Sequence, residues 1–173
     1  MSKQKNRSKN QKMKSPTIHP SMIDSGNEII NKYTLIAAGV GVIPSPMVNS
    51  VGIAVMEIAM IDEMAKNYKF DFPTKPALVK AFISLVSSIG PVYLAMKSRS
   101  AVSAVPIVGR LLSTGIYSMA GAISVYAVGK IFQRHFESGG ETLSMDNAFL
   151  RKIFKEAYQE GKEKLPKMIA QST

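Results

Sequence analysis

The chain has 173 residues, enough for one domain with tails, and 46% of them are hydrophobic. It contains no cysteine and only two histidines, so the composition excludes a disulfide scaffold and offers no recognisable zinc-binding set. The formal net charge of +10 leaves three interpretations: nucleic-acid binding, binding to anionic lipid, and simple solubility.

The first fourteen residues carry much of this charge and contain no acidic or aromatic residue. Such a segment cannot bury a core, so we predict a disordered tail and linker over residues 1–24, held in the cytoplasm. It is either a solvated arm or a surface attracted to anionic headgroups at about 1 kcal/mol per basic residue. Nucleic acid is the less favoured partner because the next segments are apolar. The basic residues are Lys3, Lys5, Arg7, Lys9, Lys12 and Lys14.

An uncharged stretch follows between Lys32 and Glu57, and Pro44 and Pro46 interrupt it near its centre. Proline lacks an amide donor and restricts the residue before it, so one helix must end there, and a second one can begin just beyond. The pattern predicts helices over about 26–43 and 47–68. Each arm holds roughly 11 to 15 apolar residues, fewer than the roughly 20 that a bilayer crossing needs. The hairpin is therefore either the interior of a bundle or a segment that dips into a membrane.

The first of these helices has a predicted start and a predicted packing face. Ser25 and Glu28 match a capping box, which predicts that the helix begins at Gly26. Gly39 and Gly41 lie near its end, where they indicate either a closely packed neighbour or ordinary turn chemistry beside the prolines.

The second helix carries a methionine stripe and one acidic residue. Met56, Met60 and Met64 recur every four residues, a spacing more typical of core packing than of an adaptable partner surface. Glu57 lies inside the apolar run, where a carboxylate must find a partner, bind a proton or face water. It indicates either a mild polar seam or a proton or ion site.

A third helix is predicted over about 76–96, with Thr74 as its cap. Between Lys80 and Lys97 lie 16 uncharged residues, but Gly90 and Pro91 interrupt them and predict a kink or break.

The fourth and longest helix is predicted over about 106–136. Between Arg110 and Lys130 lie 19 uncharged residues, long enough to span a bilayer but diluted by serine, threonine and glycine. Because every connection is basic, re-entrant or interfacial hairpins are favoured over four crossings, with two crossings by the third and fourth helices as the alternative. Small residues suited to close helix packing are Thr114, Ser118, Gly121 and Ala122.

Ser138, Gly139 and Gly140 are suited to ending this helix, and Asp146 is a good N-cap for a last one. The last helix combines an apolar stripe from Phe149 to Tyr158 with a basic face. It either lies on anionic lipid or docks on the bundle. The sequence thus divides into the tail, a hairpin domain over 25–137, and a linker with an amphipathic helix over 138–173. Basic residues of the last helix assigned to a lipid surface are Arg151, Lys152 and Lys155.

No catalytic constellation is recognisable in the sequence. It lacks the phosphate-binding loop, the serine-hydrolase elbow and the paired-histidine zinc motif. His19 and His135 lie far apart, and both are expected to be incidental. We therefore expect no enzyme activity, no cofactor and no metal.

Three stretches together resemble a known family: IINKYTLIAAGVGVIPSPMVNSVGIAVMEIAMIDEMAKNY, SSIGPVYLA and VGKIFQRHFESGG. They are similar to the YcjF-like family, bacterial proteins of unknown function whose domain is sometimes joined to an Era-like GTPase domain. The resemblance covers about residues 28–146 and implies a helical domain associated with the inner membrane, without established catalytic residues. Because this sequence lacks a GTPase domain, a nucleotide-driven role would require a separate GTPase as partner.

The sequence therefore predicts an all-α fold in which membrane-associated helical hairpins with Pro and Gly breaks form a small bundle. The expected function is a self-assembling scaffold or organiser at the bacterial inner membrane, with cytoplasmic tails. The expected partners are anionic lipid and further copies of the chain. Two alternatives stay open: a pore or transporter component that uses Glu57, and a soluble helical adaptor for a separate GTPase.

Overall fold

The computed structural model describes residues 18–40, 46–72, 74–102 and 110–172. They form five α-helices, one short 3₁₀ helix and no strand, which confirms the predicted all-α fold. The elements are α1 (Pro20–Val40), α2 (Pro46–Asn67), α3 (Lys75–Val102), α4 (Arg110–Glu137), η1 (Thr142–Ser144) and α5 (Asn147–Ser172).

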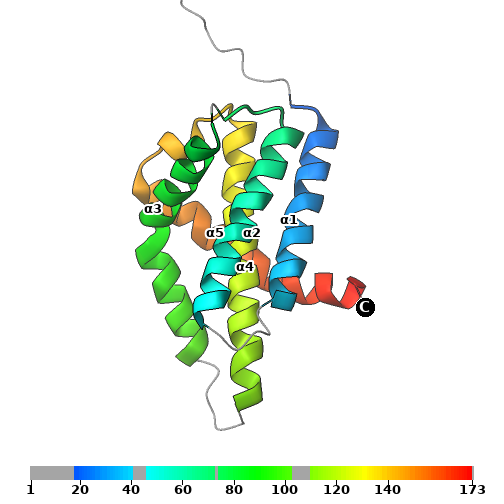
Figure 1. Cartoon of the computed structure of the whole chain (residues 1–173), viewed down its shortest axis with the longest axis vertical. Coiled ribbons are helices and arrows are strands. Elements are labelled where there is room, and N and C mark those ends of the chain that lie inside the picture. The colour runs from blue at the N-terminus through cyan, green and yellow to red at the C-terminus, as the bar shows by residue number, and fades with distance from the viewer. Residues whose placement is uncertain (1–17, 41–45, 73, 103–109, 173) are drawn as a thin grey trace, which may run out of the picture.

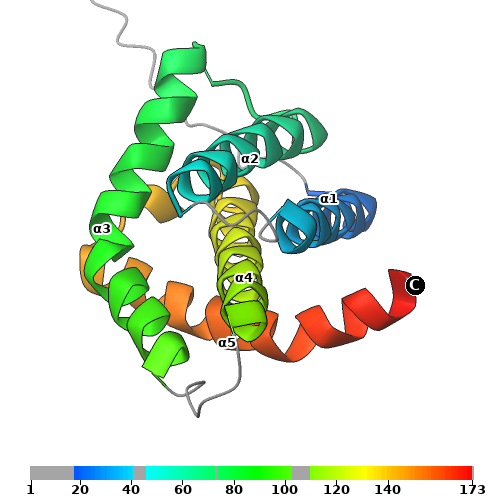
Figure 2. The same ribbon diagram turned by 60° about the horizontal axis from the view of Figure 1, so that its bottom comes forward.

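The helix α4 runs through the middle of the bundle, and α1, α2, α3 and α5 surround it (Figure 2). We call the end where α1 and α3 finish and α2 and α4 begin the hairpin end, which is the lower end in Figure 1. The opposite end, where α1 begins, is the tail end. The last helix, α5, crosses α4 obliquely instead of joining the up-and-down arrangement (Figure 1).

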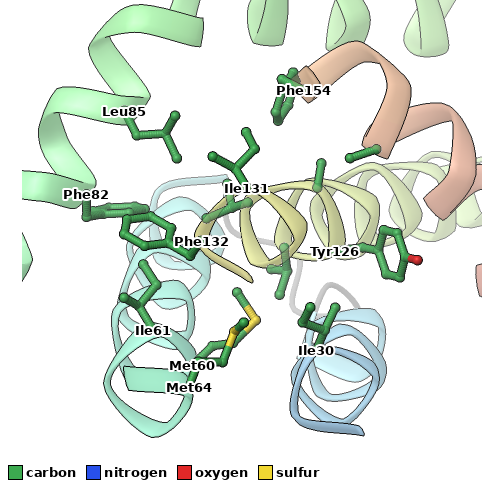
Figure 3. Close-up of a cluster of buried hydrophobic side chains, with 14 of the residues drawn as sticks. Ile30, Met60, Ile61, Met64, Phe82, Leu85, Tyr126, Ile131, Phe132 and Phe154 are labelled. Atoms are coloured by element: carbon green, nitrogen blue, oxygen red, sulfur yellow. The ribbon is translucent and has the colours of Figure 1, made fainter. Parts of the chain in front are cut away.

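The core lies around the second half of α4, because helices cover this part on all sides. Nearly every residue from Ala120 to Phe136 is buried. Figure 3 shows the inward-pointing side chains that meet it, among them Ile30 from α1, Met60 from α2 and Leu85 from α3.

Gly129 marks the closest approach within this core. A Cβ atom there would lie 2.9 Å from Cγ1 of Ile30 and 3.1 Å from the sulfur of Met60. The missing side chain thus allows α1 and α2 to pack tightly on α4.

The start of α1 differs from the predicted one. The helix begins at Pro20, so the capping box at Ser25 and Glu28 was wrong, and the last five residues of the predicted linker are helical. Proline is pre-organised for the first helical position, and Nδ1 of His19 lies 2.9 Å from Oγ of Ser21 in the first turn. Gly26 lies inside the helix against the Tyr68 ring, where a Cβ would stand 2.6 Å from the phenol oxygen.

Several other predicted boundaries are confirmed. The helix α2 begins at Pro46, as its missing donor allows, whereas Pro44 lies outside the described residues. Oγ1 of Thr74 accepts from the amide of Ala77 at 3.3 Å. Oδ1 of Asp146 accepts from the amide of Phe149 at 2.8 Å, as an N-cap does. Gly139 and Gly140 both have positive φ after the end of α4.

The predicted break at Gly90 and Pro91 was wrong, because α3 continues through both residues to Val102. A proline inside a helix leaves the carbonyl four residues before it, here that of Ser87, without its usual donor. Here Nε of Arg151 on α5 donates to the carbonyl oxygen of Ser88 at 2.8 Å. A neighbouring helix thus supplies a hydrogen bond in the turn that the proline weakens.

Candidate membrane-facing surface

The outward-facing side chains of α1 and α2 change from charged to apolar between the tail end and the hairpin end. On α1, Glu28 and Lys32 are exposed, and Ile36 follows one turn later as an exposed apolar residue. On α2, which runs the opposite way, Val51 and Val55 are 62% and 60% exposed near the hairpin end. Residues four apart share a helix face, so each helix presents one row whose chemistry changes along its length.

The helix α3 shows the same change over its first part, before Lys97 and Arg99 near its end. Lys80 is exposed towards the tail end, and Ile83 and Val86 are exposed beyond it. On α4, Met119 adds a further exposed apolar side chain on the hairpin side of the core. We call these exposed apolar residues the apolar collar: Ile36, Val51, Val55, Ile83, Val86 and Met119.

Exposed ion pairs lie towards the tail end from the collar, one of them between α1 and α2 and the other within α2. Nζ of Lys32 lies 2.6 Å from a carboxylate oxygen of Glu63, and Lys66 pairs with Asp62 at the same distance. The hydrogen bond from Lys32 holds the pKa of Glu63 below its ordinary value. Exposed pairs of this kind contribute only about 0–1 kcal/mol each. Their location is what matters here. Because exposed charged groups require water, the surface on the tail side of the collar is suited to an aqueous environment.

The uncharged stretches of α3 and α4 are somewhat shorter than a bilayer core. At 1.5 Å per residue, the 16 residues between Lys80 and Lys97 extend about 24 Å, and the 19 between Arg110 and Lys130 about 28 Å. The hydrocarbon core is about 30 Å thick. Within the described helices, one 18-residue window, Lys75–Val92 of α3, is long and apolar enough to cross by length and composition, and 22% of it is buried in the bundle.

The docked position of α5 bears on such a crossing. Arg151 is bonded to Ser88 inside the window, and the next residue, Lys152, is exposed. A complete crossing would place this charged helix in hydrocarbon, where each Lys or Arg costs at least about 2.5–3.5 kcal/mol. With α5 docked, the part of the bundle free to contact lipid is therefore its hairpin end.

The predicted packing residues on α2 and in the second half of α4 face the core. Met60 and Ala122 are fully buried, and Met56 is partly buried against the same cluster. A Cβ on Gly121 would lie 3.3 Å from Cδ1 of Ile53, so α2 and α4 approach closely there. The core interpretation of the methionine stripe is confirmed.

The remaining predicted packing residues behave differently or lie outside the described part. Gly39 is exposed, and among the described residues no atom lies within 4 Å of where its Cβ would stand, so the described part of the bundle contains no close neighbour on that side and turn chemistry stays the alternative. Gly41 and the side chains of Thr114 and Ser118 lie outside the described residues.

Glu57 is buried, as its place in an apolar run predicted. Its side chain is 6% exposed. It lies four residues after Ile53 and three before Met60, both buried, so it belongs to the core-facing side of α2.

The last helix docks on the bundle and keeps a basic outer face. Its residues Leu150, Phe154 and Leu165 are buried, whereas Phe149, predicted in the same stripe, is 40% exposed. Lys152 and Lys155 face outward as expected. Arg151 instead uses its Nε inside the molecule, and the six basic residues of the tail lie outside the described part of the chain.

A polar network between α1, α2 and α4 had no signal in the sequence. Nζ of Lys130 donates to Oδ1 of Asn27 at 3.0 Å and to Oε1 of Gln133 at 2.7 Å. Nε2 of Gln133 donates to the phenol oxygen of Tyr68 at 3.2 Å. Burial lowers the pKa of Lys130 and raises that of Tyr68 to about 12. These groups join helices far apart in sequence, so spacing does not reveal them.

His135 is the buried histidine of the described chain. Aromatic rings surround it, with the centroid of Phe70 at 5.4 Å, and its Nδ1 accepts from the amide of Leu143 at 3.3 Å. Burial lowers its pKa to about 4. This environment is that of a packed, neutral imidazole. Across the residues whose positions are described, no group of three His, Asp or Glu side chains is arranged to hold a metal.

Comparison with known proteins extends these observations. The model of a family described as a domain of unknown function, DUF697, matches residues 8–163. The chain belongs to this family. The match covers the last part of the tail and almost all of the helical bundle, including α5 as far as Glu163.

A curated relative is named Magnetosome membrane protein 22, from Magnetospirillum gryphiswaldense. It is 23% identical to this chain over 147 residues, which are 82% of this chain and 73% of the relative. No solved structure matches the chain.

Proposed function

We propose that this protein is a non-catalytic, membrane-associated organiser that inserts its hairpin end into the cytoplasmic face of a bacterial inner membrane. The observation that carries the proposal is the shared change along α1, α2 and α3 from charged to apolar outward-facing residues. One end of the bundle thereby has a surface suited to lipid, while the other end has one suited to water.

Two further findings support association with a membrane. The relative from Magnetospirillum gryphiswaldense is named as a membrane protein. The window Lys75–Val92 also has the length and composition of a membrane helix. The resemblance to YcjF-like proteins favours the inner membrane, with the basic tail on the cytoplasmic side.

Self-association is the second part of the proposal. Gly39 has open space where a Cβ would stand, and Ile36 beside it is exposed. A small residue beside exposed apolar surface allows two helices to approach closely in lipid. A second copy would place its own α1 against this position, so that the membrane-bound protein forms an assembly that organises other components.

The test is flotation of the full-length protein with neutral phosphatidylcholine vesicles. Val55→Glu places a carboxylate in the collar without disturbing the core, because Val55 is mostly exposed. Transfer of a charge into an apolar layer costs at least about 2.5–3.5 kcal/mol. The vesicle-bound fraction should therefore fall strongly. Loss of binding would appear as protein remaining at the bottom of the gradient.

A matched control is Ser21→Glu, which adds the same charge at an exposed helical position near the tail end. It should bind vesicles like the unmodified chain. Equal binding by both variants, or no binding of the unmodified chain to neutral vesicles, would end the proposal of apolar insertion.

The burial of Glu57 keeps one alternative function open, a pore or transporter component. In that case Glu57→Gln would change ion or proton flux across liposomes, whereas an organiser predicts unchanged flux. An adaptor for a separate GTPase would instead remain in the soluble fraction when membranes are washed with carbonate.

A further inference from the structure

The two edges of α5 carry opposite charge. Successive residues of an α-helix are about 100° apart, so positions 151, 155 and 162 fall together on one side of the buried face. Positions 156, 160 and 163, which carry the acidic residues, fall on the other side, where Lys164 and Lys167 also lie. We call these sets the basic edge (Arg151, Lys155 and Lys162) and the acidic edge (Glu156, Glu160 and Glu163).

Contacts with α3 and α4 fix the direction in which each edge faces. Arg151 reaches Ser88, which lies in the uncharged part of α3 beyond Lys80. Glu160 accepts from the phenol of Tyr126 at 2.8 Å and interacts electrostatically with Lys130, where the charged part of α4 begins. The basic edge therefore faces the hairpin end, and the acidic edge faces the tail end.

The lysines of the basic edge are exposed and available. Within the described part of the chain, neither Lys155 nor Lys162 forms an ion pair, in contrast to Lys164, which lies 2.7 Å from a carboxylate oxygen of Glu160. Ile169, one heptad after Lys162, is exposed and apolar and continues the same edge. The edge thus joins positive charge to apolar surface on the side of the collar.

We propose that the basic edge of α5 binds the headgroups of anionic phospholipids at the rim of the inserted bundle. This inference rests on the proposed insertion of the hairpin end, and it names the lipid class that the surface selects. Lysine stems lie along apolar surface while their ammonium groups reach phosphates. The acidic edge faces away from the bilayer, so the charges that anionic lipid would repel are kept at a distance. By binding headgroups, α5 sets the depth and orientation of the inserted bundle.

The test compares two double variants of the full chain that remove the same charge from the same helix. Lys155→Gln with Lys162→Gln removes the basic edge. Lys152→Gln with Lys167→Gln removes two exposed lysines that lie off this edge. Each is floated with phosphatidylcholine vesicles and with vesicles that also contain phosphatidylglycerol. At about 1 kcal/mol per lysine near the surface, the edge variant should lose roughly 10- to 30-fold of its partitioning onto the anionic vesicles, and the control variant much less.

The two vesicle compositions distinguish this inference from the proposed function. Binding of the edge variant to neutral vesicles should be unchanged, because insertion of the collar does not use these lysines. Equal losses in both double variants would show a net-charge effect and overturn the headgroup site. Release from anionic vesicles by inorganic phosphate, beyond that by sodium chloride of equal ionic strength, would assign the lysines to free phosphate and also overturn it. If the unmodified chain does not bind neutral vesicles, this result contradicts the proposed insertion of the hairpin end and not the selectivity of the basic edge for anionic lipid.

Discussion

At the scale of single residues, His135 links burial to pH dependence. The folded protein holds its pKa at about 4, below the ordinary 6.5, because burial disfavours the charged imidazolium. The unfolded chain therefore binds a proton between pH 6.5 and 4 that the folded chain does not. The stability contributed by a neutral His135 is present above pH 6.5 and is lost as pH falls towards 4.

His135→Phe should remove this dependence while retaining an aromatic side chain among the surrounding rings. The difference in unfolding free energy between the two proteins should change by up to about 3 kcal/mol between pH 7 and pH 4, with the histidine protein losing more. Urea unfolding followed by circular dichroism at several pH values measures it. Parallel pH profiles would show that His135 titrates normally and is not held neutral.

At the scale of the elements, the bond from Arg151 to Ser88 couples α5 to the turn before Pro91. Arg151→Met keeps an unbranched stem but removes the donor. We expect a loss of about 1.5–3 kcal/mol, the range for hydrogen bonds to charged groups. Amide hydrogen exchange should become faster in the first turns of α5 and around residue 88 of α3. Lys152→Met, at the exposed neighbouring position, should leave both segments unchanged, and equal effects of the two substitutions would contradict the coupling.

The elements also show what the sequence can predict. The proline at 46, the hydroxyl of Thr74 and the carboxylate of Asp146 act through local chemistry, so the helix starts that they mark were predicted to within a residue or so. The start of α1 was missed because Pro20 outweighs the later capping box. The turn before Pro91, through which α3 continues, is contacted by Arg151, 60 residues away along the chain. No local pattern contains that contact.

At the scale of the whole molecule, the uncharged stretches could be identified from the sequence, but their location at one end of the bundle could not. The sequence predicted apolar helices that are short for a crossing. It did not show that exposed Ile36, Val55 and Met119 lie towards one end while the ion pairs of Lys32 and Lys66 lie beyond them. That arrangement follows from the antiparallel packing of α1, α2, α3 and α4, which places separate apolar segments on one continuous surface. The facing direction of the two edges of α5 likewise requires its crossing over α4.

The central claim is that the hairpin end enters lipid while the tail end stays in water. The chain has no cysteine, so Val55→Cys and Glu28→Cys each give a single site for a nitroxide label. With the protein bound to phosphatidylcholine vesicles, collision with oxygen and with a water-soluble nickel chelate reports the depth of each label. The account predicts that the label at 55 is reached mainly by oxygen and the label at 28 mainly by the chelate. Equal access of the chelate to both labels in the bound protein would contradict it.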